Sequence, residues 1–304
     1  MVAINHTLTN YARGIMQDRS KGLASFVCPF TSTGGFASGQ YLDFNDSNSF
    51  RIYNTKRAQG GPTQRITFDA ESPFYNCSPH GLEIAIDDFE REKAGKSDPL
   101  GLEKAKIDTL LSAKAVSHEY QIWTAIAAAK AAEGGVGNWS SADVDPIAEI
   151  DALIGTIALD TGMMPNRMAI SLATWTLLRH NAKVIARQPG AAVVGATTAQ
   201  IAAMTINPGL DIRIGVMSYD TAKRGASAAS KVNIMGSDAY LFIGQDSPSL
   251  YDPAFAKAFT SGESGVDSVT EYRDDNANSD VYKVPWSVDI KVVGSICAKR
   301  ITAS

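Results

Sequence analysis

The stretch that follows Asp98 constrains the fold of this chain more than any other. Asp98 suits a helix N-cap, Pro99 suits the first helical position, and Gly134-Gly135 stops a pattern that runs to Ala132. Its apolar residues recur at helical spacing: Leu100, Ile107, Leu110, Leu111, Tyr120, Trp123 and Ile126. Over thirty residues span roughly 50 Å at about 1.5 Å per residue, more than a compact domain of this size needs. The pattern therefore predicts a single long helix, here called the spine helix.

Shorter helices and several strands are expected after this spine. A second capping pair, Asp145-Pro146, opens a helix that ends at Gly162, and helices also cover Ser171–Ile185 and Thr197–Met204. Trp175, Leu178 and Ile185 are predicted to face inward. Strands are predicted at 49–55, 65–68, 167–170, 211–216, 232–235, 239–243, 266–272 and 287–293, the last two as a pair around the turn 274–279. Helices and antiparallel strands mix without a regular alternation, so the fold class is α+β.

Composition and charge narrow the function. The chain has 304 residues, 44% of them hydrophobic, and no window is apolar for long enough to predict a membrane span. Charged residues make up 20%, below the roughly 25% of typical soluble domains, so part of the surface is expected to lie against neighbours. The net charge of −4 argues against a general nucleic-acid-binding protein. Residues 1–67 carry seven Lys or Arg against three Asp, a balance of +4 that leaves −8 for the remainder.

The first 82 residues are predicted to reach outward. Residues 1–45 form an arm, because glycine- and serine-rich stretches interrupt it and its apolar residues are too sparse to close a core. The strands at 49–55 and 65–68, joined by a basic Gly/Pro-rich tip, form a hairpin with few apolar residues, which is unlikely to stand alone in water. The candidate inter-subunit contacts are its basic residues Arg51, Lys56, Arg57 and Arg65. Docking onto an acidic neighbouring surface is favoured over a solvated loop or nucleic-acid binding.

Familiar catalytic motifs are incomplete in this sequence. The phosphate-loop-like Gly95-Lys96-Ser97 has Glu90 where the first glycine must stand. His118-Glu119 begins a zinc-protease pattern, but the second ligand position is Ile122. Gly135-Val136-Gly137 lacks the third glycine of a dinucleotide fingerprint. No catalytic, cofactor-binding or metal-ligating residue is therefore predicted, and the chain is not expected to be an enzyme.

The cysteines and the N-terminus indicate the compartment. Cys28, Cys77 and Cys297 are odd in number and scattered, which favours neither a disulfide framework nor a zinc site. The first residues lack the charged-then-apolar pattern of a secretion signal. We therefore expect synthesis in a reducing cytoplasm.

Several short motifs together resemble a known family. They are Phe50–Ala58 followed by Tyr75-Asn76-Cys77 and Leu82-Glu83, Trp139-Ser140-Ser141 leading to Asp145-Pro146-Ile147, Thr161–Met168 with Trp175–His180, and Lys223–Ala226 before Ile234–Asp238. In this order they resemble the major capsid proteins of tailed bacteriophages, whose Hong Kong 97-type fold encapsulin shells share. The resemblance covers nearly the whole chain.

The resemblance implies a division of the chain into five parts. These are an N-terminal arm (1–45), an extended β-hairpin loop (46–82), a peripheral domain with the spine helix (83–162), an axial domain (163–263) and return strands of the peripheral domain (264–304). The axial domain is expected around five-fold and six-fold centres, and the extended loop over the neighbouring subunit.

The implied function is structural. Copies of the chain would assemble through pentamers and hexamers into an icosahedral virion capsid around double-stranded DNA, bound without sequence specificity. The chain would be made in the host bacterial cytoplasm and use no cofactor and no membrane, and its other partners would be scaffolding, portal and decoration proteins. The alternatives are an encapsulin-like or gene-transfer-agent shell and, from another class, a small-molecule enzyme with an unrecognised site.

Overall fold

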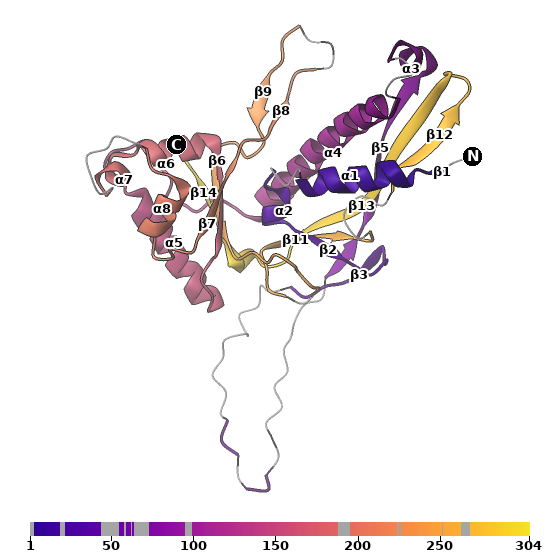
Figure 1. The fold of residues 1–304 in the computed structure, drawn as a ribbon. Helices are drawn as coiled ribbons and strands as arrows, with labels where there is room; N and C mark the ends of the chain where they lie inside the picture. Colours follow the sequence, from indigo (N-terminus) through magenta and orange to yellow (C-terminus); the bar gives the residue numbers. More distant parts are fainter. Residues whose placement is uncertain are drawn as a thin grey trace.

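The fold is built on two β-sheets with helices packed against them (Figure 1). The computed structural model describes residues 3–18, 22–43, 55–57, 59–61, 63, 73–94, 99–187, 195–223, 225, 227–250, 252–262 and 268–304. None of the helices within these ranges combines the length and the hydropathy that crossing a membrane requires.

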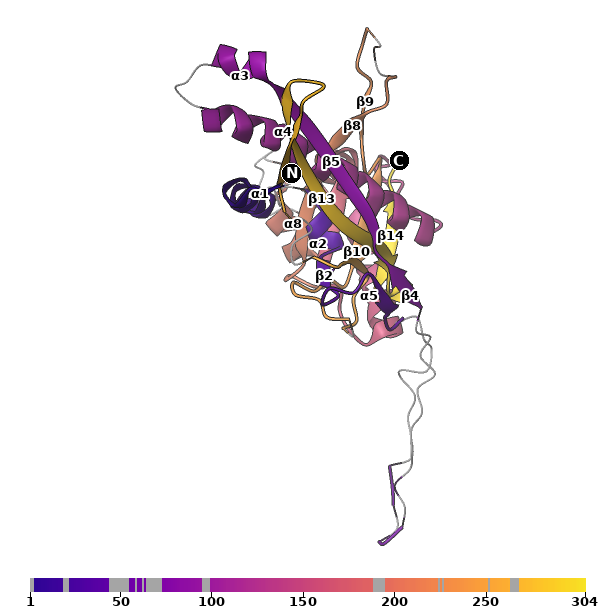
Figure 2. The ribbon, with the colours of Figure 1, turned by 90° about the vertical axis from the view of Figure 1, so that its right-hand side faces the viewer.

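The first sheet has six strands and is mostly antiparallel. They are β1 (Ala3–Ile4), β2 (Phe30–Ser32), β5 (Ser78–Asp87), β11 (Ala256–Thr260), β12 (Thr270–Asp274) and β13 (Ser279–Val292). The long strand β13 is central, because it pairs with β5, β11 and β12. Strands β12 and β13 pair from Asp274 opposite Ser279, which confirms the polar turn. The predicted partner of 266–272 is wrong, because β12 pairs with residues 279–283, whereas residues 287–292 pair with β5 and β11. The helix α4 (Pro99–Ala129) packs on this sheet, and α1 (His6–Asp18) packs on α4 (Figure 2).

The 31-residue helix α4 is the predicted spine. Five of its seven predicted inward residues are less than one tenth exposed: Ile107, Leu110, Leu111, Trp123 and Ile126. The prediction is wrong for Leu100 and Tyr120, which are 38% and 44% exposed. Lys114, His118 and Glu119 instead continue the buried stripe. A pattern that counts only apolar residues could not predict the burial of these three, because their side chains are polar.

The second sheet has four strands and carries the shorter helices. In spatial order the strands are β14 (Ala298–Thr302), β10 (Asp238–Phe242), β6 (Arg167–Ser171) and β7 (Asp211–Gly215). Around it lie α5 (Pro146–Thr161), α6 (Leu172–His180), α7 (Ala182–Ala186) and α8 (Thr198–Met204) (Figure 1). The strands β6 and β7 pair in parallel, and the chain between them forms α6, α7 and α8. This is a crossover connection in an otherwise antiparallel sheet.

Local capping chemistry explains which predicted helices are confirmed. Asp145 Oδ1 accepts from the N–H groups of Ile147 at 3.2 Å and Ala148 at 3.3 Å, and Gly162 ends α5 with a φ of 68°. Helix α8 begins after Thr197, as predicted, with a full capping box.

The third predicted helix, Ser171–Ile185, is divided in two at Asn181, which is a correction. The side chain of Asn181 accepts from Lys183 N at 2.9 Å and caps α7. Its amide donates to the carbonyl oxygens of Trp139 at 3.0 Å and Ser141 at 3.1 Å. Trp175 and Leu178 are buried as predicted, whereas Ile185 is 46% exposed.

The predicted strand at 232–235 is shorter than expected. Strand β9 (Lys231–Asn233) pairs with β8 (Ser218–Asp220) in a small hairpin, and the chain turns at 234–237. The Asn233 side chain accepts from Met235 N at 2.9 Å, which favours the turn over a longer strand. The remaining short elements are α3 (Asp88–Ala94) and the 3₁₀ turn η1 (Ser295–Cys297).

The N-terminal segment contributes to the core, contrary to expectation. Helix α2 (Ala24–Val27) and strand β2 follow α1, and β2 adds a parallel strand to the six-stranded sheet beside β11. Six apolar residues of this segment are at most 3% exposed: Leu8, Ala12, Leu23, Phe26, Val27 and Cys28. The prediction failed because it weighed how many apolar residues the segment has rather than whether they share one face.

A two-stranded ribbon closes the base of the predicted extended loop. Strands β3 (Ser38–Gln40) and β4 (Phe74–Asn76) pair, and Tyr41 N donates to Pro73 O at 3.1 Å. The two ends of the predicted extended loop therefore lie side by side. The predicted strands at 49–55 and 65–68 lie outside the described residues, apart from Thr55 and its neighbours, which form no strand.

The predicted division into peripheral and axial domains stays a prediction, but the sheets join residues across its boundaries. Strand β14, from the predicted return segment, pairs with β10 in the four-stranded sheet. Strand β11, from the predicted axial segment, pairs with β13 in the six-stranded sheet.

Candidate functional site: the assembly surface

The basic loop tip is exposed. Lys56 and Arg57 both lie on the surface, and Arg57 Nη1 donates to Thr63 Oγ1 at 3.3 Å within the tip. Figure 1 draws these described tip residues well away from both sheets. The other two candidate contact residues, Arg51 and Arg65, lie outside the described residues.

The ribbon at the loop base has one buried and one exposed face. Tyr41 and Tyr75 pack on Phe259, with ring centroids 5.2 and 4.8 Å apart. On the opposite face, Phe74 is 69% exposed, and Phe36, in the turn before β3, is 70% exposed. Phe74 is on a face that alternation would make polar, and together with the exposed Phe36 it marks a surface suited to contact.

A second exposed apolar group surrounds the end of α5. Its members are Leu159, Met163, Met164 and Ile206, which are 87%, 38%, 52% and 58% exposed. Ile206 N donates to Asp151 Oδ1 at 2.8 Å, which brings the segment after α8 against α5. Sequence reasoning treated Met163-Met164 only as a turn, and nothing in the local pattern marked Leu159 as exposed.

Ion pairs hold the outer end of the six-stranded sheet. Arg273 Nη1 donates to Asp88 at 2.6 Å and to Asp280 at 3.3 Å, while Arg91 pairs with Asp280 at 2.7 Å and with Glu103 at 3.2 Å. The hydrogen bond from Arg273 lowers the pKa of Asp88. The pairs connect α3, the strands β12 and β13 and the start of α4, so this end of the sheet is cross-linked by ion pairs.

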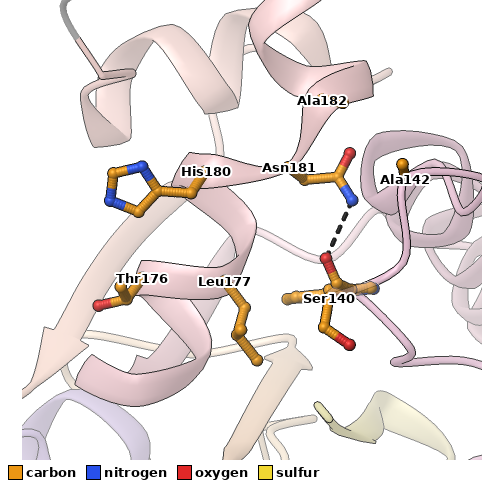
Figure 3. A pocket seen from close by; sticks show the side chains of 8 residues that line it. Ser140, Ala142, Thr176, Leu177, His180, Asn181 and Ala182 are labelled. Atoms are coloured by element: carbon orange, nitrogen blue, oxygen red, sulfur yellow. Dashed lines mark hydrogen bonds between the residues drawn. The ribbon is translucent and has the colours of Figure 1, made fainter.

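A shallow pocket of about 380 Å³ lies between the 139–142 segment and α6 (Figure 3). Its lining residues are Trp139, Ser140, Ala142, Thr176, Leu177, His180, Asn181 and Ala182. The amide of Asn181 is occupied by backbone carbonyls, and the ring of His180 points away from Ser140 (Figure 3). No carboxylate belongs to this lining. The pocket therefore holds no nucleophile–base–acid arrangement.

The remaining sequence motifs have structural roles or lie outside the described residues. Glycine is required at Gly137, with a φ of 102°, where the chain packs against the C-terminal strand. His118 is buried and stacks on Phe30 with centroids 5.0 Å apart. Across the described part of the chain, no three His, Cys, Asp or Glu side chains gather closely enough to hold a metal ion. Residues 95–98, which include the phosphate-loop-like motif, are not described.

The three cysteines are free and buried. Burial raises the pKa of the Cys297 thiol to about 11 and raises that of Cys28 further. Thiols held in the neutral form are poor nucleophiles, so these positions are suited to packing rather than to chemistry.

Comparison with known proteins decides the fold. No family model matches the chain, and no curated protein matches it. Among solved structures, a phage-related protein of Bordetella bronchiseptica superposes with a TM-score of 0.78 at 24% identity, covering 99% of this chain and 97% of the other. The capsid of Myoviridae phage XM1 matches with a TM-score of 0.53 at 12% identity, covering 93% of this chain and 91% of the other. A holo encapsulin complex from Synechococcus elongatus matches with a TM-score of 0.54 at 10% identity, covering 93% and 88%.

The chain has the Hong Kong 97-type capsid fold. The resemblance and the α+β class inferred from the sequence are confirmed at this level. Within this fold, α4 is the long helix, and the ribbon of β3 and β4 is the base of the predicted extended loop. The exposed apolar groups on the ribbon and around α5 are the surface residues that sequence reasoning missed.

Proposed function

We propose that the chain is the major capsid protein of a tailed bacteriophage, a structural protein without catalytic activity. In this proposal it self-assembles through pentamers and hexamers into an icosahedral shell around double-stranded DNA. The observation that carries the proposal is the full-length likeness to the Hong Kong 97-type fold, which the capsid of phage XM1 also has. The function then lies in contacts between copies.

The exposed apolar groups support self-assembly. Phe74 on the ribbon, Phe36 in the turn before it, and Leu159 and Ile206 near α5 are each more than half exposed in the single chain. Contiguous exposed apolar surface usually marks an interaction site. Because the two groups lie on different elements, they suit head-to-tail contacts, in which one surface meets a different surface of the next copy and a ring closes.

The charge distribution supports docking of the loop onto a neighbour. Residues 1–67 carry +4 and the remainder carries −8, and Lys56 and Arg57 lie at the exposed loop tip. We propose Arg51, Lys56, Arg57 and Arg65 as inter-subunit contacts with an acidic surface of the next copy. Such complementarity selects the partner and the register more than it adds affinity.

The proposal also assigns regions and partners. Residues 163–263 would surround the five-fold and six-fold centres as the axial domain, and 83–162 with 264–304 would form the peripheral domain. The chain would be made in the host bacterial cytoplasm and reside in the virion capsid. Scaffolding, portal and decoration proteins would be further partners, and DNA would be enclosed without sequence recognition.

An encapsulin-like or gene-transfer-agent shell is the alternative. The likeness to the encapsulin complex of S. elongatus, with a TM-score of 0.54, is about as strong as the likeness to the phage XM1 capsid, with 0.53. The content of the particles separates these readings: packaged phage genome supports the capsid, an enclosed protein cargo supports the encapsulin-like shell, and short fragments of host DNA support the gene-transfer agent.

The experiment is negative-stain electron microscopy of the purified chain, with sedimentation velocity on the same sample. Closed particles, or rings of five or six subunits, are expected. Where the chain stays monomeric or dimeric, co-expression with candidate scaffolding proteins follows. Failure to form rings or shells with every candidate would overturn the proposal and favour the enzyme alternative.

A further inference from the structure

The short segment Gly22–Cys28 lies between the two halves of the fold. Figure 1 shows α2, within this segment, between α4 and the four-stranded sheet. Leu23, Phe26, Val27 and Cys28 are each at most 3% exposed. The segment is therefore packed on both sides, and each side can be described separately.

On the helix side, one carboxylate holds the segment. Glu119 accepts from the backbone N–H groups of Leu23 at 3.1 Å and Ala24 at 2.8 Å, and from Trp123 Nε1 at 2.9 Å. Glu119 is only 2% exposed. Its two oxygens satisfy amides at the start of α2, which have no partner within so short a helix. Three donors fix the position of the carboxylate.

On the sheet side, an aromatic ring contacts two guanidinium groups. The Phe26 ring centroid is 4.2 Å from Arg213 Cζ on β7 and 4.9 Å from Arg167 Cζ on β6. Arg167 Nη1 also donates to Phe26 O at 2.8 Å, and Phe242 of β10 packs against the ring at 5.6 Å. The segment therefore contacts three of the four strands of this sheet.

Glycines show that the segment fits without clearance. A Cβ atom on Gly22 would lie 2.6 Å from Glu119 Oε2, and one on Gly215 of β7 would lie 3.1 Å from Leu23 Cδ1. A Cβ on Gly244 would lie 2.5 Å from Arg167 Cδ. An added methyl group at any of these positions forces the segment or its neighbour to move.

A second contact joins α4 to the same sheet further along the helix. Arg300 of β14 donates from Nη1 to Ala127 O at 3.2 Å and to Lys130 O at 3.1 Å. Glu119 and Lys130 are eleven positions apart, about 16 Å along a helix. One contact point lets a rod rotate about it, whereas two separated points fix its direction.

We propose that Gly22–Cys28 is a latch that sets the angle between α4 and the four-stranded sheet, with the carboxyl-terminal end of α4 as the pivot. Opening the latch changes the shape of the subunit while both parts keep their secondary structure. The inference concerns a single subunit and does not depend on the proposed shell.

The test measures the distance across the latch in dispersed subunits. Spin labels are attached at Ala113→Cys on α4 and Thr176→Cys on α6, both exposed positions, and their distance distribution is recorded by pulsed electron paramagnetic resonance. The unsubstituted chain is the labelling control, because its own three cysteines are buried. Gly22→Ala opens the helix side of the latch, and Gly14→Ala is its matched control, since a Cβ there meets nothing within 4 Å.

Arg213→Met tests the sheet side independently. Its side chain is half exposed, so the substitution removes the cation over Phe26 without burying a new polar group. Both latch variants are expected to shift or broaden the distance distribution while circular dichroism stays unchanged, and Gly14→Ala is expected to match the parent. If Gly22→Ala fails to fold, Arg213→Met decides. A folded latch variant with the parent's distribution, or an equal shift in Gly14→Ala, overturns the proposal.

Discussion

Glu119 Oε2 accepts a hydrogen bond from the backbone N–H of Ala24 at 2.8 Å, across 95 positions of sequence. The contact joins the middle of the longest helix to the N-terminal segment. It explains why a segment interrupted by glycine and serine belongs to the body of the protein. The buried carboxylate supplies what the local sequence lacks, which is a cap for the four-residue helix α2.

Deleting residues 1–30 is therefore expected to prevent folding. The deletion removes Leu8, Leu23, Phe26 and Val27 from the core, and each fully buried side chain of this kind contributes about 1.5–3 kcal/mol. Their sum approaches the 5–15 kcal/mol that stabilises a typical domain. Circular dichroism and thermal unfolding measure the effect, with Phe36→Ala as an exposed-residue control. A truncated chain that unfolds cooperatively at the parent's temperature would contradict this.

Reversing charge at the loop tip, by Lys56→Glu with Arg57→Glu, is expected to block assembly and leave the subunit folded. Both residues are exposed on the surface, so the change in unfolding free energy is expected within about 0.5 kcal/mol. Electron microscopy scores rings and shells, and thermal unfolding scores the fold. Lys183→Glu, an exposed charge reversal on α7, is the control. Normal shells from the double variant would remove the docking role of the tip.

The apolar group around α5 separates assembly from stability. Leu159→Ser, at a side chain 87% exposed, is expected to change the unfolding free energy by less than about 0.5 kcal/mol yet reduce ring formation. Leu153→Ser on the same helix, at a side chain 8% exposed, is expected to cost at least about 2 kcal/mol. Urea unfolding and sedimentation velocity measure the two effects. Unimpaired assembly by Leu159→Ser would show that this group lies outside the contacts.

Acid is expected to destabilise the subunit through His118. Burial, and then the charges of Lys114 and His80, lower the pKa of His118 from 6.5 to about 4. Between these values the unfolded chain binds a proton that the folded chain does not, so the free energy of unfolding falls as pH falls, by up to about 3 kcal/mol. Burial raises the pKa of Glu119, which acts in the opposite direction.

Urea titrations from pH 7 to pH 4 test the assignment to His118. His118→Gln is expected to flatten the dependence, because glutamine does not titrate. His180→Gln, at an exposed histidine, is the matched control and is expected to leave the slope unchanged. A slope that survives in His118→Gln would assign the acid sensitivity to other groups.

Local signals determined the elements whose ends and faces depend on near neighbours. Asp145 and Gly162 bound α5 because capping needs only adjacent backbone groups, and the turn between β12 and β13 is marked by its own polar residues. The long helix α4 follows from its apolar periodicity together with Pro99 at its first position. The motif order was also enough to identify the Hong Kong 97-type fold, though no single motif carried it.

Tertiary structure alone decided which residues are buried where the pattern is polar or sparse. His118 and Glu119 lie in the core because α2 and β2 cover them, and Leu159 is exposed because nothing described in the single chain packs on that side of α5. The pairing of strand β14 with β10 was likewise decided by the tertiary structure. Such contacts join residues far apart in sequence, and their energies come from partners that no local window contains.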